Sequence, residues 1–124
     1  MKREAFEVWM QGYLACWTHN HPEAIGALFS ADCKYYTQAF REPWTGRETI
    51  VAGWLERADW QGEWDFDYRW VAIDGATGVL EGVTTYHTQG SAYHNVWFIT
   101  LDDEGQCMEF KEVWVEKPED GVSS

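Results

Sequence analysis

The chain has 124 residues, a length typical of one domain that can bury a core without help from a metal or disulfide. Its formal net charge of −12 argues against binding to nucleic acid or anionic lipid, because both need a basic surface. No apolar stretch approaches the roughly 18 residues of a membrane span, and the N-terminus does not resemble a signal peptide. We expect a single domain over residues 1–117 and a flexible tail over residues 118–124.

The cysteines indicate the redox environment of the protein, and the tryptophans indicate a cavity or an interface. Cys16, Cys33 and Cys107 are odd in number and lack a CxxC spacing, so we interpret them as buried thiols in a reducing cytoplasm. Nine tryptophans are unusual in so short a chain. Because a buried indole N–H usually needs a partner, we expect some tryptophans to line a cavity or an interface.

The first half of the chain has helical periodicity. An apolar stripe predicts a first helix over residues 3–19. Its members are Phe6, Trp9, Met10, Tyr13, Leu14 and Trp17. A proline-led second helix is predicted over residues 22–30 and a short strand over residues 33–37. A third helix is predicted from Thr45, which would form a capping box with Glu48.

The second half alternates with a period of two. Residues 64–115 predict four antiparallel strands joined by turns at residues 75–77, 90–91 and 102–105. One face of these strands then collects Phe66, Tyr68, Trp70, Tyr86, Tyr93, Trp97, Phe110 and Trp114. Asn95 and Glu112 are the strongly polar side chains on this face, which is therefore more typical of a small-molecule pocket than of a plain core.

The predicted register places three polar groups of this inner face in one row. Tyr86 pairs with Asn95, and Asn95 pairs with Glu112, so hydrogen bonds between them are geometrically possible. The same register sends His87 and His94 to the outer face as cross-strand partners. Two histidines without a neighbouring carboxylate are a weak metal site, so we predict no metal and no cofactor.

The outer face of the predicted sheet is half apolar. It holds Val71, Val79, Val83, Val96, Phe98, Val113 and Val115, mixed with Glu81, Thr100 and Lys111. No helix is left over to cover this face, so we predict a homodimer that packs through it.

Four short segments resemble one known superfamily. Residues 21–29 (HPEAIGALF), 32–36 (DCKYY), 46–50 (GRETI) and 103–107 (DEGQC) are similar to motifs of the nuclear transport factor 2-like (SnoaL-like) superfamily. The resemblance covers nearly the whole chain. It implies an α+β fold: a conical barrel in which a curved antiparallel sheet wraps around three N-terminal helices and leaves an internal pocket.

The resemblance and the alternation together predict the residues of that pocket. Its candidate catalytic residues are Glu112, Tyr86 and Asn95. Its candidate substrate-binding residues are Tyr13, Trp17, Tyr36, Trp54, Tyr68, Trp97, Trp114 and Arg41. A carboxylate among aromatic rings is desolvated, which raises its pKa toward neutrality and suits acid–base chemistry. Arg41 lies in the loop after the first strand, where it could meet an anionic substrate group or pair with a surface acid.

Two functions remain open. The first is an isomerase, dehydratase or cyclase type of enzyme that acts on a small apolar or aromatic molecule, with Glu112 as acid and base and with Tyr86 and Asn95 at the oxyanion. The second is a non-catalytic ligand-binding or dimeric association module, because no complete catalytic set of the superfamily's known enzymes is present. A structural dimer whose cone is filled by its own tryptophans is a weaker third possibility.

Overall fold

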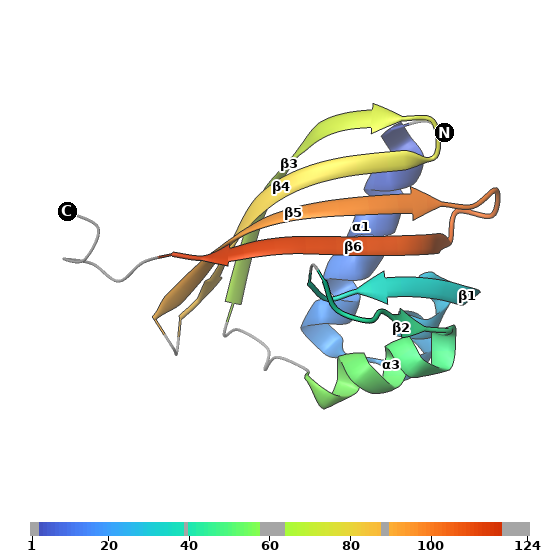
Figure 1. Cartoon of the computed structure of the whole chain (residues 1–124), viewed down its shortest axis with the longest axis horizontal. Helices are drawn as coiled ribbons and strands as arrows, with labels where there is room; N and C mark the ends of the chain where they lie inside the picture. The colour runs from blue at the N-terminus through green and yellow to red at the C-terminus, as the bar shows by residue number, and fades with distance from the viewer. Residues whose placement is uncertain (1–2, 39, 58–63, 88–89, 118–124) are drawn as a thin grey trace.

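The computed structural model describes residues 3–38, 40–57, 64–87 and 90–117, and it has an α+β fold (Figure 1). The helices are α1 (Arg3–His19), α2 (Pro22–Ala27) and α3 (Arg47–Glu56). The strands are β1 (Phe29–Tyr36), β2 (Trp44–Thr45), β3 (Trp64–Asp74), β4 (Thr77–Tyr86), β5 (Ser91–Leu101) and β6 (Cys107–Glu116). Within these ranges no helix is long and apolar enough to span a bilayer. The predicted tail at residues 118–124 lies outside the described residues.

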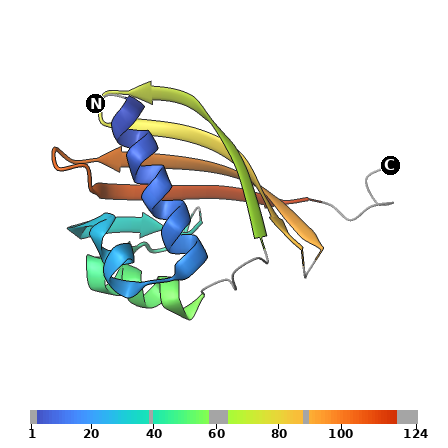
Figure 2. The same ribbon diagram turned by 180° about the vertical axis from the view of Figure 1, so that it is seen from behind.

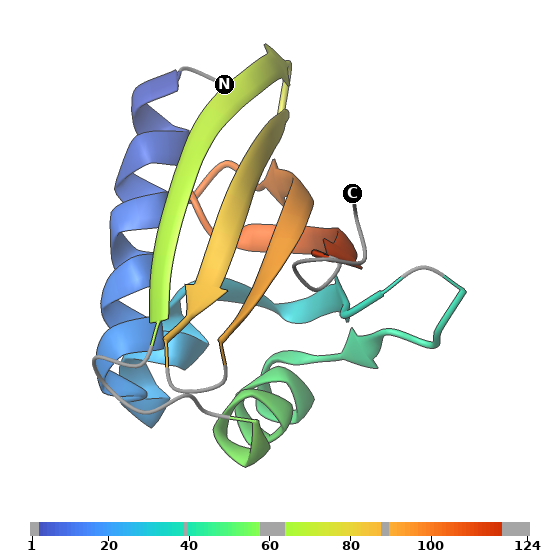
Figure 3. The same cartoon turned by 90° about the vertical axis from the view of Figure 1, so that its left-hand side faces the viewer.

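The strands form one curved, open sheet in the order β2-β1-β6-β5-β4-β3. The four strands predicted over residues 64–115 pair antiparallel as expected, and β1, whose pairing the sequence did not predict, runs parallel to β6. The first helix α1 crosses the concave face, and α3 lies beside β1 and β2 (Figure 2). Viewed from the side, the sheet bends around α1 as the resemblance implied (Figure 3). Register shifts within the β1–β6, β3–β4 and β5–β6 ladders mark irregularities of the kind that bend a sheet.

The apolar stripe of α1 packs against the inner face of the sheet. Phe6 and Met10 are fully buried, and the ring of Tyr13 stacks parallel to that of Phe110 with centroids 5.8 Å apart. The helix spans the residues that its stripe predicted. It therefore supplies the central layer of the core.

The boundaries of the other two helices differ from prediction. α2 ends at Ala27 because Phe29 already belongs to β1. α3 begins at Arg47, after Gly46, whose φ of +94° is the left-handed region that favours glycine. Thr45 does not cap the helix, because its backbone pairs with Lys34 in the sheet. The predicted capping box is therefore wrong.

The predicted strand registers are also wrong, by two or four residues over most of each ladder. Tyr68, not Trp70, lies opposite Gly82, because the turn has two residues and a bulge follows at residue 71. Tyr86 lies opposite Ser91 instead of Asn95, since β4 ends at Tyr86 and β5 begins at Ser91.

The third hairpin has the same kind of error. Glu112 lies opposite Trp97, and Asn95 lies opposite Trp114. The predicted row Tyr86–Asn95–Glu112 is therefore absent. An even shift keeps each side chain on its face, however, so the aromatic inner face remains as predicted.

Candidate functional site

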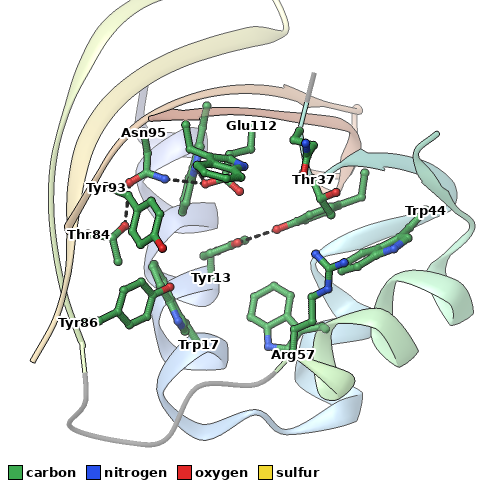
Figure 4. Close-up of a pocket in the computed structure, with 15 residues that line it drawn as sticks. Tyr13, Trp17, Thr37, Trp44, Arg57, Thr84, Tyr86, Tyr93, Asn95 and Glu112 are labelled. Atoms are coloured by element: carbon green, nitrogen blue, oxygen red, sulfur yellow. Dashed lines mark hydrogen bonds between the residues drawn. The ribbon is translucent and has the colours of Figure 1, made fainter. Parts of the chain in front are cut away.

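A cavity of about 420 Å³ lies between the sheet, α1 and the end of α3 (Figure 4). Its walls are Tyr13, Trp17, Tyr35, Thr37, Gln38, Trp44, Trp54, Arg57, Thr84, Tyr86, Tyr93, Asn95, Trp97, Glu112 and Trp114. This volume is within the range of about 300–1,000 Å³ that is usual for small-molecule pockets.

Glu112, on β6, is the acidic side chain of the cavity wall. Its Oε2 accepts hydrogen bonds from Asn95 Nδ2 at 2.7 Å and from Trp97 Nε1 at 2.9 Å. Burial raises the pKa of Glu112, and these two hydrogen bonds offset part of the rise. Within the described part of the chain, Oε1 accepts no hydrogen bond, so one carboxylate oxygen remains available to a ligand.

Asn95 is held in its orientation by a second hydrogen bond. Thr84 Oγ1, on β4, donates to Asn95 Oδ1 at 2.8 Å. Both side chains are buried, with 2% and 4% of their surface exposed. Because the amide oxygen accepts from Thr84, the amide nitrogen points to Glu112. Two hydrogen bonds, from Thr84 to Asn95 and from Asn95 to Glu112, thus connect three neighbouring strands and position the carboxylate.

A pair of tyrosines forms a second polar group in the cavity. The hydroxyls of Tyr13, on α1, and Tyr35, on β1, are 2.9 Å apart. Burial, with smaller contributions from neighbouring charges including that of Glu112, raises the pKa of both phenols. Both phenols are therefore neutral near pH 7. One hydroxyl hydrogen joins the pair, so the other remains as a donor.

The structure brings eight of the eleven predicted site residues to this cavity. They are Tyr13, Trp17, Trp54, Tyr86, Asn95, Trp97, Glu112 and Trp114. Tyr86 does not reach Asn95 as predicted, and Thr84 occupies that role.

Three predicted residues do not line the cavity. Tyr36 lies outside because the alternation of β1 buries Cys33 and Tyr35 instead. Tyr68 packs its ring against Phe66 and Trp70, away from the cavity. Arg41 is exposed and absent from the cavity wall.

Several residues of the cavity wall were not predicted from the sequence. Thr84 shares the inward parity of Tyr86 on the same strand, so the alternation itself could have identified it. Arg57 lies three residues after Trp54 and thus near the same side of α3. Its guanidinium carbon lies 5.3 Å from the centroid of the Trp44 ring.

The two strand histidines are exposed, and they are not cross-strand partners. His87 hydrogen-bonds Asp65, and His94 Nε2 lies 3.4 Å from Glu81 Oε2. The residue opposite His94 on β4 is Val83. Among the residues that the structure describes, no group of three or more histidine, cysteine, aspartate or glutamate side chains is placed to hold a metal.

Solved structures share this fold. A candidate ketosteroid isomerase from Kribbella flavida DSM 17836 superimposes with a TM-score of 0.72 at 22% identity, over 94% of this chain and 82% of that chain. A protein of unknown function with a cystatin-like fold from Methylobium petroleophilum PM1 gives 0.74 at 15%, over 100% and 84%. An epoxide hydrolase of the LEH-like type from M. tuberculosis gives 0.64 at 14%, over 86% and 80%. At these identities the similarity shows the fold alone.

Sequence comparison shows the family to which this chain belongs, and it does not show an activity. No curated protein matches the chain. The model of the SnoaL-like domain matches residues 10–110, which include most of the helices and strands described above. The chain therefore belongs to the SnoaL-like domain family, within the nuclear transport factor 2-like superfamily.

Proposed function

We propose that this protein is an enzyme that moves a proton on a small, largely apolar molecule, with Glu112 as the acid and base. The observation that carries the proposal is a carboxylate in the cavity wall with a raised pKa, one oxygen held by two hydrogen bonds and the other open to a ligand. A base that is fixed in position and poised nearer to neutral pH is suited to proton transfer.

The proposed reaction is an isomerisation next to a carbonyl group. The carboxylate of Glu112 removes a proton from the carbon beside the carbonyl. The C–H electron pair then forms a C=C bond and the carbonyl oxygen becomes an enolate. The substrate also carries a C=C bond that is conjugated with the enolate, and the protonated Glu112 returns the proton to the far carbon of that bond. The double bond shifts toward the carbonyl, the C=O bond re-forms, and nothing is consumed.

The enolate oxygen needs a hydrogen-bond donor, and the cavity offers phenols. The pair Tyr13–Tyr35 is neutral near pH 7 and keeps one hydroxyl hydrogen for a ligand. Tyr86, on the sheet side of the cavity, is a second candidate donor (Figure 4). Asn95 acts through Glu112 in this proposal, since both ends of its amide are engaged by protein groups.

Exchange of hydrogen for deuterium tests the proposal without knowledge of the substrate. In D2O, the protein should speed exchange at the carbon beside the carbonyl of 2-tetralone, followed by NMR. Glu112→Gln should lower this acceleration by roughly 10²-fold or more. Glu109→Gln is the matched control, because Glu109 lies on β6 but outside the cavity. Equal exchange with Glu112→Gln and with the unchanged protein would show that Glu112 is not the base.

A non-catalytic binding module is the second candidate. Nine of the fifteen residues of the cavity wall carry aromatic rings, which favours stacking of an aromatic ligand. In that case Glu112 would only orient the ligand. Aromatic and terpenoid compounds should then raise the melting temperature without any exchange or turnover. A screen in which no compound shifts the melting temperature would count against both candidates.

We also propose that two copies associate through the outer face of the sheet. Apolar side chains there are exposed, among them Val83 and Val113 at 44% each. Val113→Glu should convert the dimer to a monomer in light scattering, whereas Val8→Glu, at an exposed valine of α1, should not. A monomer before any substitution would refute the dimer.

Finally, we propose the reducing cytoplasm as the location. Cys16, Cys33 and Cys107 are all buried free thiols, as is usual for proteins of such a compartment.

A further inference from the structure

The cavity has a single cationic side chain in its described wall, that of Arg57, directly after α3. In the described part of the chain, Arg57 forms no ion pair with a carboxylate. The chain as a whole carries 21 acidic residues against 9 lysines and arginines. A cation without an acidic partner among the described residues, in so acidic a protein, suggests that a ligand can be its partner.

The guanidinium group is held in place by aromatic rings instead. It lies over Trp44, whose ring stacks on Tyr35 at 5.3 Å with an angle of 18°. Tyr35 in turn stacks on Phe110 at 4.4 Å with an angle of 11°. A ring beneath the guanidinium restricts it without using its N–H groups. Among the residues that the structure describes, no group accepts a hydrogen bond from these donors, which match a carboxylate in geometry.

The two charged groups of the cavity come from different walls. Glu112 lies on the sheet, whereas Arg57 comes from the end of α3, beside Trp44 (Figure 4). A negative group of a ligand is repelled near Glu112 and attracted near Arg57. Because Arg57 is the cation of the described cavity wall, it is the place within the cavity that favours an anion.

We propose that the natural ligand of this cavity is a small aromatic or alicyclic carboxylate, with its ring among the aromatic walls and its carboxylate at Arg57. This inference rests on the proposed function, since it gives the substrate class of the same cavity. It places the reacting carbon at Glu112, at the other end of the ligand. An amine in an aromatic cage is the competing ligand class, and the cation of Arg57 disfavours it.

Three naphthalene probes of similar size separate these classes by calorimetry. They are 1-naphthoate, which is an anion, 1-naphthamide, which is neutral, and 1-naphthylmethylammonium, which is a cation. The protein should prefer naphthoate. Arg57→Gln should weaken naphthoate about tenfold, the effect of one charge-assisted hydrogen bond, and leave naphthamide nearly unchanged. Arg57→Lys should lie between, because it keeps the charge but loses the planar fork.

Arg41→Gln is the matched control, because it removes the same charge from an exposed site outside the cavity wall. It should bind all three probes as the unchanged protein does. The inference is wrong if Arg57→Gln binds naphthoate undiminished, if Arg41→Gln weakens it equally, if the amine binds best, or if no probe binds. Glu112→Gln should keep the preference for naphthoate while losing proton exchange, so failure of this inference is distinguishable from failure of the catalytic proposal.

Discussion

The inner face of the sheet is closely packed at one end and polar at the other, although β4, β5 and β6 run through both. At the packed end, Leu80, Ile99 and Phe110 are completely buried. At the polar end, Tyr86 is half-buried and Trp114 is 41% exposed. The strands and the face are the same, so the difference must come from what lies opposite them.

The opposing element is α1, whose first turns cover the packed end. Phe6 fills that end so tightly that a Cβ on Gly78 would lie 2.8 Å from its ring. At the polar end, Trp17 of the last turn contacts Phe66 and Trp97, and its ring forms part of the cavity wall. The helix ends two residues later, at His19, and supplies no further side chains to the sheet. The polar end of the sheet therefore meets the cavity beside the last turn of α1.

The largest expected difference between the two ends concerns stability. Phe110 and Trp114 are aromatic residues on the same strand and face, four positions apart. Phe110→Ala should lower the free energy of unfolding by about 3–5 kcal/mol, because it leaves a cavity in packed surroundings. Trp114→Ala should cost about 1 kcal/mol or less, since its ring is already partly exposed. Urea unfolding measures both, and equal losses would contradict the contrast.

A smaller effect is expected within the polar end. Asn95→Ala should raise the pKa of Glu112, because it removes a hydrogen bond that lowers it. Thr84→Val should raise it less, since Thr84 acts only through Asn95. Each buried partner left unsatisfied should also cost about 1–3 kcal/mol of stability.

The pKa can be followed by NMR of the carboxyl carbon of Glu112. Thr77→Val is the matched control, because Thr77 hydrogen-bonds Thr100 across the same two strands, at 2.9 Å and away from the cavity. It should leave the pKa unchanged. A larger rise with Thr84→Val than with Asn95→Ala would show that Thr84 does not act through the amide of Asn95.

The face of each strand was predictable from sequence, whereas the register was not. Alternation encodes only whether a side chain points to the inner or the outer face. A register error of two or four residues therefore leaves the predicted face unchanged. The bulge at residue 71 and the points at which β4 ends and β5 begins decide the pairing. Neither leaves a clear pattern in the alternating residues.

The candidate site was predictable to a similar degree. Asn95 and Glu112 were expected to meet as directly opposed residues, and they meet diagonally through a 2.7 Å hydrogen bond. Inward parity was enough to bring them together. Arg57 was missed because its position depends on where α3 ends and packs, which no period along the chain records. Residues placed by tertiary packing are therefore the ones that sequence patterns overlook.

The smallest expected effect is a pH dependence of stability that has opposite signs on the two faces of the sheet. On the inner face, burial raises the pKa of Glu112 above its unfolded value. The folded protein therefore holds this proton more tightly, and the stability from it is lost as the pH rises through the folded pKa. On the outer face, the hydrogen bond from Arg69, with a smaller contribution from His94, lowers the pKa of Glu81. The stability from Glu81 is present above its unfolded pKa and lost as the pH falls.

Unfolding by urea between about pH 3 and about pH 8 measures both signs. Relative to Glu112→Gln, the unchanged protein should become less stable as the pH rises. Relative to Glu81→Gln, it should become more stable over the same range, by a small amount because Glu81 is solvated and screened. Each difference curve plots the free energy of unfolding of the unchanged protein minus that of one variant against pH. The two curves should slope in opposite directions, although each variant removes one glutamate carboxylate. Parallel curves would mean that Glu112 is solvated like Glu81, and the cavity would then lack the desolvated carboxylate on which its proposed chemistry depends.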